Sequence, residues 1–299
     1  MCGIVGLFLK NQRHEPELGR LTALMLDQMR HRGPDSAGFA IYSDGQEHRT
    51  KLTVLAEGFD ADWMAVGDRL ALAMDDDVSV RVIADHAVIA SSADGRSMRQ
   101  WLLDNVAGVS VMSYGQSIEL YKAVGDPSIV AERYGLSGLS GTHAIAHTRM
   151  ATESVVTTNG SHPFSTGEDT CLVHNGSLSN HNILREILES KGETFQTDND
   201  TEVAAGYLAW RVREGDSLTE ALERGLSDFD GFYTFCVGVR DGFAVVRDPI
   251  ACKPAVMAET DDWVAVASEY RAIAQLPDVG DATVWEPEPS HILSWSRSS

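Results

Sequence analysis

The sequence predicts an α+β domain in which helices cover β-sheets in layers. An apolar stretch opens the chain at 2–9, three helical patterns follow one another between about 179 and 226, and four short apolar stretches come after them. Strands, then helices, then strands again are typical of this class rather than of alternating βαβ units. The chain has 299 residues, 43% of them hydrophobic, so it can bury a large core. That length fits one large domain or two modest ones.

The first third of the chain predicts a strand, a helix and a two-stranded meander. The run at 2–9 is apolar throughout, as expected of a buried strand. Pro16 opens a helix that Gly33 ends, and the apolar positions between them recur at helical spacing. A polar turn at 43–47 separates the two strands of the meander. Those strands are residues 36–42 and 50–57.

Residues from about 50 to 140 predict an insertion, or an excursion that carries a lid, within the domain. Its strand and helix patterns alternate without a clear layer order. The expected strands are 78–90, 110–114 and 117–124, and the expected helices are 97–106 and 127–136.

The second half of the chain has sharper patterns. Strands at 142–149 and 170–176 run into loops, and a helix at 179–192 is expected to begin with Ser179 as its cap. The apolar face of that helix is Ile183, Leu184, Ile187 and Leu188. Two further helices are expected at 200–215 and 217–226. An antiparallel strand series then comprises 231–239, 242–248, 254–259 and 263–269.

The charge balance limits the classes of partner. The formal net charge is −20, from 24 basic and 44 acidic residues, and such a surface repels nucleic acid. An acidic face can serve solubility alone, or it can dock a basic partner subunit. No stretch has the ~20 continuous apolar residues of a membrane helix, and no signal segment leads the chain, so we expect a cytoplasmic protein without a membrane partner.

One of the four cysteines has an unusual position. None of them forms a CxxC pair, so neither a metal site nor an iron–sulfur cluster is expected in this chain. Cys171 and Cys236 lie in apolar runs typical of buried thiols, and Cys252 lies in a loop pattern. Cys2 becomes the N-terminus if Met1 is removed, and the free α-amine, with a pKa near ~8, can then accept the thiol proton.

Four further residues complete a possible site, although each has a simpler interpretation. Arg149 follows a strand and can hold a carboxylate with two hydrogen bonds, or form a surface salt bridge. Asn175 and Gly176 can form an oxyanion hole, or a hairpin turn. Asp200 can hold an ammonium, or cap a helix. Together these groups match free glutamine, which has a carboxylate, an ammonium and an amide to attack.

Several further segments of the chain form a recognisable set. They are "CGIVG", "HRGPDSAG", "AHTRMAT", "SHPF", "VHNGSLSNHNILREIL", "NDTEV", "VVRDPIACKPAV" and "VASEYRAI". Together they resemble one enzyme family, the class II glutamine amidotransferases. The resemblance implies a single domain spanning 2–299 with the αββα sandwich of N-terminal-nucleophile hydrolases, in which two antiparallel sheets lie between helical layers. It also implies a site in which Cys2 is the nucleophile and Asn175 and Gly176 form the oxyanion hole.

The same resemblance implies the residues around the nucleophile. Arg149 binds the glutamine carboxylate, Asp200 binds the α-amine, and Thr152 lines the pocket. Arg32 and Asp35 support a loop beside the nucleophile. Met150 stands where many relatives have an aromatic residue. We expect His147, His162 and His174 to be structural rather than catalytic.

The run from "GTHAIAHTRMAT" to "CLVHNGSLSNHN" most resembles stand-alone amidotransferase subunits of glutamate-synthase-like complexes, including N-methylglutamate synthase of methylamine-using bacteria. No synthase is expected within 299 residues, so the partner is expected to be a separate synthase subunit in a hetero-oligomer. Any FMN and iron–sulfur cluster belong to that partner, and no cofactor is expected here. Two alternatives stay open: a structural or regulatory subunit with weak turnover, and an N-terminal-nucleophile hydrolase that cuts another small amide.

Overall fold

The computed structural model of the protein describes residues 2–43, 49–56, 61–151 and 155–297. Its largest sheet is antiparallel and has seven strands. These strands are β1 (Gly3–Leu9), β2 (Ser36–Tyr42), β7 (Ile118–Val124), β8 (His143–Arg149), β13 (Val256–Glu259), β14 (Trp263–Ala267) and β15 (Thr283–Trp285). Their order across the sheet is β15-β13-β14-β1-β8-β2-β7.

A second antiparallel sheet faces the first. Its strands are β9 (Phe164–Gly167), β10 (Thr170–Leu178), β11 (Gly231–Val239), β12 (Gly242–Arg247) and β16 (Ile292–Ser296), in the order β16-β12-β11-β10-β9. The helices on the far sides of the two sheets are α1 (Leu18–Gln28), α4 (Pro127–Arg133), α5 (His181–Ser190), α6 (Asp200–Arg213), α7 (Leu218–Asp228) and α8 (Tyr270–Ile273).

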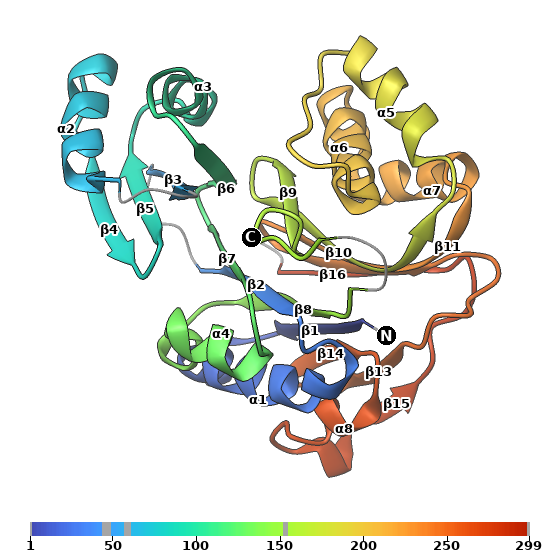
Figure 1. Ribbon diagram of the computed structural model, residues 1–299. Coiled ribbons are helices and arrows are strands. Elements are labelled where there is room, and N and C mark those ends of the chain that lie inside the picture. Colours follow the sequence, from blue (N-terminus) through green and yellow to red (C-terminus); the bar gives the residue numbers. More distant parts are fainter. Residues whose placement is uncertain (1, 44–48, 57–60, 152–154, 298–299) are drawn as a thin grey trace.

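The two sheets lie between two helical layers (Figure 1). Helices α1, α4 and α8 cover the seven-stranded sheet, and α5, α6 and α7 cover the five-stranded sheet. Strand β1 shows why its sequence is apolar throughout. Val5 and Leu7 belong to the core shared with α1, whereas Ile4 and Phe8 belong to the core between the sheets. A strand covered on both faces needs apolar side chains at every position.

A third sheet stands apart from the sandwich, at the upper left of Figure 1. It consists of β3 (Thr50–Ala56), β4 (Ser79–Ile83), β5 (His86–Ser91) and β6 (Val109–Gly115), in the order β4-β5-β3-β6. Helices α2 (Trp63–Met74) and α3 (Gly95–Asn105) pack on one face and share a separate apolar core with it. This unit occupies most of the segment in which an insertion is predicted.

The structure confirms the predicted layers of two antiparallel sheets between helices, and it corrects the pairing of several strands. The expected meander is wrong, because β2 pairs with β7 and β8 in the large sheet while β3 pairs with β5 and β6 in the third. Most of the predicted turn at 43–47 lies outside the described residues. The expected C-terminal strand series is divided between the two large sheets. Local patterns mark strands, but burial of both faces decides their partners.

Two expectations about the helix at 181–190 are also wrong. Its N-cap is Asn180 rather than Ser179, and the Asn180 side chain bonds to the backbone of Asp228 and Asp230 before β11. Ile183 and Ile187 are exposed, at 64% and 45%, because α5 packs on α6 and buries only the leucines of its apolar stripe. Among the residues that the structure describes, no helix combines the length and apolarity needed to span a membrane.

Candidate functional site

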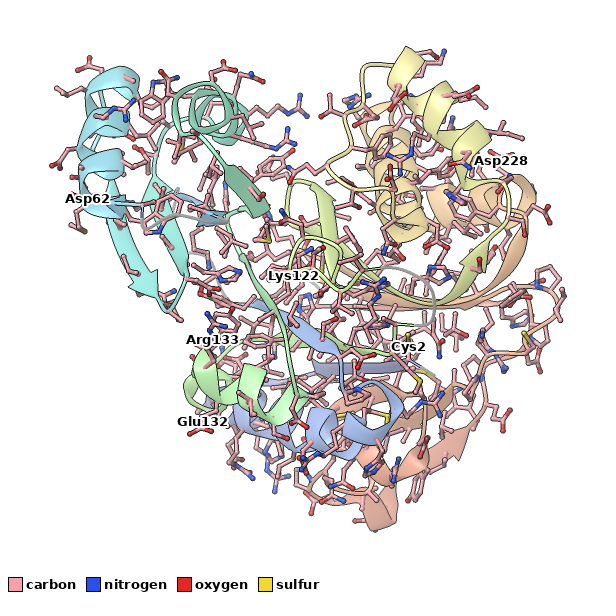
Figure 2. The ribbon with its side chains drawn as sticks, viewed as in Figure 1. Cys2, Asp62, Lys122, Glu132, Arg133 and Asp228 are labelled. Atoms are coloured by element: carbon pink, nitrogen blue, oxygen red, sulfur yellow. The ribbon has the colours of Figure 1, made fainter. Side chains whose placement is uncertain are left out.

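The ends of three strands bring Cys2 and Arg149 to the same edge of the large sheet. Gly3 of β1 pairs with Thr148 of β8, and Ser36 of β2 pairs with Arg149. Cys2 directly precedes β1, so its backbone is level with Arg149. Figure 2 shows Cys2 at this end of β1, next to the five-stranded sheet. From that sheet, the Asn175 side chain donates Nδ2 to the carbonyl oxygen of Cys2 at 3.3 Å.

Further contacts hold the backbone of Cys2 and the first residues of β1. The Arg32 guanidinium donates Nε to the Cys2 carbonyl at 2.9 Å, and its Nη1 lies 2.7 Å from a Glu269 carboxylate oxygen. Ser268 accepts the Ile4 amide at 2.9 Å. Sequence reasoning assigned no role to Ser268 or Glu269. Their signal was the "VASE" segment, whose last two residues, Ser268 and Glu269, directly follow the strand that pairs with β1.

Gly176 occupies a position that only glycine fits without strain. Its φ is +150°, and a Cβ atom there would lie 2.0 Å from the Phe232 carbonyl oxygen and 2.8 Å from His174 Nε2. The hairpin interpretation of Asn175 and Gly176 is wrong, because both residues pair with β11 within a strand ladder. This part of the ladder lies beside the backbone of Cys2, because the Asn175 amide reaches the Cys2 carbonyl.

Asp200 is the first residue of α6, but it is not the cap. The cap is Asn199, whose side chain accepts the Thr201 amide at 2.9 Å. Asp200 instead accepts the Leu178 amide at 2.9 Å, and its other carboxylate oxygen lies 3.7 Å from His174 Nδ1. Burial of Asp200 opposes ionisation, but the nearby His174 and the Leu178 amide outweigh it and lower the pKa of Asp200 to about 2. The carboxylate is therefore charged at neutral pH.

One backbone carbonyl connects Arg149 to the start of α6. The Gly160 oxygen accepts Arg149 Nη1 at 2.9 Å and Asn199 Nδ2 at 3.4 Å. The Arg149 guanidinium and Asp200 therefore belong to one hydrogen-bonded region, although they come from different layers. A cation and an anion in the same region match the two charged ends of an α-amino acid.

Asp35 orients the segment that follows Arg149. Its backbone amide donates to the Arg149 carbonyl at 3.2 Å, and its carboxylate accepts the Ala151 amide at 2.8 Å. Asp35 thus contacts the chain next to Arg149, whereas Arg32 contacts Cys2 itself. Thr152, the predicted pocket residue, lies outside the described residues. Met150 is 43% exposed.

The three histidines form a buried cluster behind Asn175. His147 stacks on His162 with ring centroids 4.0 Å apart and donates Nε2 to the His174 carbonyl at 3.0 Å. His162 Nδ1 accepts the His174 amide at 3.3 Å. Burial lowers the pKa of His147 to about 3 and holds that of His162 well below its usual value. Both rings are neutral at physiological pH, and they hold the backbone next to Asn175.

Two of the remaining cysteines are buried. Burial raises the pKa of the Cys171 thiol to about 12 and also raises that of Cys236, so both thiols are poor nucleophiles. Cys252 is exposed.

One group of residues in the described ranges has the composition of a metal site. It consists of His14, Asp262 and Asp278. It lies beyond the far end of β1 from Cys2, and the Arg13 guanidinium lies 2.5 Å from Asp262 and 3.7 Å from Asp278. A cation already neutralises these carboxylates, so the group carries no metal assignment.

Comparisons with known proteins bear on the family and the fold of the chain. A family model described as a glutamine amidotransferase domain matches residues 147–275. The chain is 52% identical over 298 residues to the "Glutamine amidotransferase-like protein GlxB" of Rhizobium meliloti, covering 99% of each chain. It is 34% identical to a "Putative glutamine amidotransferase" of Methanothermobacter thermautotrophicus, covering 96% of this chain and 97% of that one.

Solved structures add evidence on the fold. The glutamine phosphoribosylpyrophosphate amidotransferase of B. subtilis aligns over 99% of this chain with a TM-score of 0.62 and 23% identity. An allosteric regulatory enzyme of purine biosynthesis aligns with a TM-score of 0.65, also at 23% identity. The chain spans about half of each of these structures, 47% in both cases. From the end-to-end relatives and the shared fold, we conclude that this chain belongs to the class II glutamine amidotransferase family.

Proposed function

We propose that this chain hydrolyses glutamine to glutamate and ammonia, with Cys2 as the nucleophile once Met1 is removed. The observation that carries the proposal is the contact between Asn175 Nδ2 and the Cys2 carbonyl, 3.3 Å, which supports Asn175 as an oxyanion-hole donor for a reaction at this residue. Arg149 is the proposed partner of the glutamine carboxylate, and Asp200, which is ionised at neutral pH, is the proposed partner of the α-ammonium.

The proposed reaction has two stages. In the first, the α-amine of Cys2 accepts the thiol proton and the thiolate attacks the amide carbon. The oxyanion accepts hydrogen bonds from the second N–H of the Asn175 amide and from the Gly176 backbone. The protonated α-amine of Cys2 then returns its proton to the leaving nitrogen. The carbon–nitrogen bond of the amide breaks, and ammonia departs. In the second stage, water attacks the γ-glutamyl thioester and releases glutamate and the Cys2 thiol.

The contacts of Arg32 support a positioning role in this reaction. The Cys2 carbonyl is held by Arg32 and Asn175 from two sides, and Glu269 in turn fixes Arg32. An N-terminal residue has a freely rotating amine unless its backbone is held. These bonds reduce the number of orientations in which the thiol and the amine can lie.

We also propose that the ammonia is consumed by a separate synthase subunit, in a complex of the glutamate-synthase or N-methylglutamate-synthase type. The sequence resemblance supports this assignment. It is further supported by GlxB and the Methanothermobacter protein, which match this chain over 99% and 97% of their own lengths and so carry no additional large domain. FMN and an iron–sulfur cluster are proposed only for the partner. Purification of the native complex, with identification of its subunits, tests this part.

The hydrolysis itself is tested by measuring glutamate release from glutamine. We expect turnover by the wild type, loss of turnover in Cys2→Ala, and unchanged turnover in the matched variant Cys252→Ala, which removes an exposed thiol. Mass spectrometry of the active protein is expected to show Cys2 as the first residue. Turnover that survives Cys2→Ala, or an active protein that retains Met1, would contradict the mechanism. A folded wild type without turnover would favour the structural or regulatory alternative.

A further inference from the structure

A large cleft lies outside the residues assigned to glutamine hydrolysis. Its volume is about 890 Å³, which is within the range of small-molecule sites. One wall is formed by α3 and β6 of the third sheet, and the other by α6 and the loop before it, with β9 between them. Cys2, Arg149 and Asp200 are not among its lining residues. The cleft therefore needs an explanation separate from the glutamine site.

Two arginines of α3 give one wall of the cleft a positive charge. Arg96 and Arg99 are three residues apart in α3 and both line the cleft. Neither forms an ion pair with a carboxylate in the described ranges of the chain. Burial raises the pKa of the Tyr114 phenol, which also lines the cleft, and the charges of Arg96 and Arg99 act on it in the opposite direction.

The carboxylates of the cleft are mostly engaged with other partners. Glu193 pairs with Arg213, and Asp169 accepts Arg240 Nε at 2.9 Å together with backbone amides. Glu202 accepts two backbone amides of the loop before α6, at 2.8 and 2.7 Å.

Among the described residues, three further carboxylates line the cleft, and none of them forms an ion pair with Arg96 or Arg99. Glu168 pairs with Arg240, Asp216 pairs with Arg211 and Arg224, and Asp241 is exposed to solvent. In a chain of net charge −20, α3 therefore offers two guanidinium groups that form no ion pair in the described ranges, and Asp94, the cap of α3, is an acid whose charge acts on Arg96.

The opposite wall has an apolar stretch on α6. Leu208, Ala209 and Val212 of α6 line it, and Val212 is 45% exposed. A ligand that satisfies both walls carries an oxyanion at one end and an apolar body at the other. Guanidinium groups bind carboxylate and phosphate oxygens with similar geometry, so the oxyanion can be either.

We propose that this cleft is a binding site for a small organic anion, whose carboxylate or phosphate is held by Arg96 and Arg99 and whose apolar body lies against α6. Lys122, which is labelled in Figure 2, does not supply the charge. It donates to the carbonyls of Ser161 and Pro163 at 2.8 and 3.2 Å and lies over the Phe164 ring.

Ligand-observed NMR titrations test the site with three simple probes. Phenyl phosphate and benzoate each combine an oxyanion with an aromatic body, and benzyl alcohol lacks the charge. We expect saturable binding of at least one anion with a dissociation constant below about 1 mM. Benzyl alcohol is expected to bind at least ~10-fold more weakly, since it makes no charge-assisted bonds. Binding of one anion and not the other identifies the oxyanion.

The variants locate the binding. The double variant Arg96→Gln with Arg99→Gln is expected to weaken anion binding by at least ~10-fold, a loss typical of one or two charge-assisted hydrogen bonds. The matched variant Arg69→Gln removes a charge from α2 of the same unit, where the guanidinium lies over Trp101 outside the cleft, and leaves binding unchanged.

A further variant does not touch the arginines. Val212→Glu puts a negative charge on the opposite wall at a half-exposed position, and is also expected to abolish anion binding. The absence of saturable anion binding to the wild type, or equal binding to the wild type and the double arginine variant, would overturn the proposal. Both measurements are made without glutamine, so they stand or fall independently of glutaminase activity.

Discussion

The two central sheets and the third sheet differ in how their faces are covered. Strands such as β1 and β2 are buried at every position, because another sheet covers one face and helices cover the other. In the third sheet, helices cover one face and residues of β4 remain exposed. Strands that are covered on both faces have little freedom to shift. The residues around Cys2 therefore lie on the most constrained part of the backbone. The third sheet contributes a charged wall and a cleft.

The largest effect is expected when a side-chain atom is added where β10 and β11 lie in close contact. Gly176→Ala adds a Cβ 2.0 Å from the Phe232 carbonyl oxygen at a φ of +150°, so strands of the central sheet must separate. We expect a loss of ~3 kcal/mol or more in the free energy of unfolding and loss of glutaminase activity. Urea denaturation and glutamate release measure both.

Gly215→Ala is the control for that substitution. Gly215 also has a positive φ, +107°, but has no atom within 4 Å of the added Cβ, so only the cost of the backbone conformation remains. We expect a destabilisation of about 1 kcal/mol with normal turnover. Equal effects of the two variants would mean that the close approach to β11 is not what constrains Gly176.

The next prediction tests whether the third sheet can be destabilised without loss of glutaminase activity. Leu102 is fully buried between α3 and that sheet, and Leu102→Ala is expected to cost ~3 kcal/mol through lost apolar contacts and a cavity. We expect faster hydrogen exchange in residues 50–56 and 86–91, with glutaminase activity within about twofold of the wild type.

Leu188→Ala is the matched substitution in the layer that carries Asp200. Leu188 is equally buried, in the core that α5 and α6 share with the five-stranded sheet. This variant is expected to raise the KM for glutamine, because the start of α6 is less firmly held. A large loss of turnover in Leu102→Ala would show that the third sheet also supports the catalytic cluster.

Replacing the proposed ammonium ligand tests the charge at the start of α6. In Asp200→Asn, the side-chain oxygen can still accept the Leu178 amide, but the negative charge is lost. We expect kcat/KM for glutamine to fall by ~30- to 100-fold, equivalent to about 2 kcal/mol, mainly through KM. Steady-state kinetics measure the fall, and an unchanged KM would contradict the proposed role.

The same carboxylate predicts a pH dependence of stability. Because the pKa of Asp200 is lowered to about 2 on folding, from about 3.9 when unfolded, its ionised form contributes stability above pH ~4. That contribution, about 3 kcal/mol for a difference of ~1.9 pKa units, is lost as the pH falls through 4 toward 2. Denaturation of the wild type and Asp200→Asn between pH 6 and 3 measures it. A difference that does not shrink toward low pH would show that Asp200 is not preferentially ionised in the folded chain.

The smallest effect is expected from replacing Glu269, which contacts Cys2 only through Arg32. Glu269→Gln weakens the 2.7 Å contact with Arg32 but leaves Arg32 able to donate to the Cys2 carbonyl. Because Glu269 is partly exposed, we expect a loss of about 1 kcal/mol or less in transition-state stabilisation, measured as a fall of several-fold in kcat. A fall as large as that in Cys2→Ala would give Glu269 a direct role in the chemistry.

The sequence by itself determined the strands and helices that carry a strong local pattern. It also singled out Cys2, Arg149, Asn175 and Asp200, because their residue types have chemistry that a core position does not need. It determined the layered α+β class as well, since the order of apolar periodicities survives in the fold. These features depend on residues that are close together along the chain.

Only the tertiary structure decided which strands are neighbours and which polar groups meet. The separation of β2 from β3 and the contact of Arg32 with Cys2 join residues distant in sequence, and no local period encodes them. The cap of α5 was decided in the same way, because Asn180 bonds to residues about 50 positions away. The physical reason is that burial of both strand faces and satisfaction of buried polar groups are properties of the packed molecule.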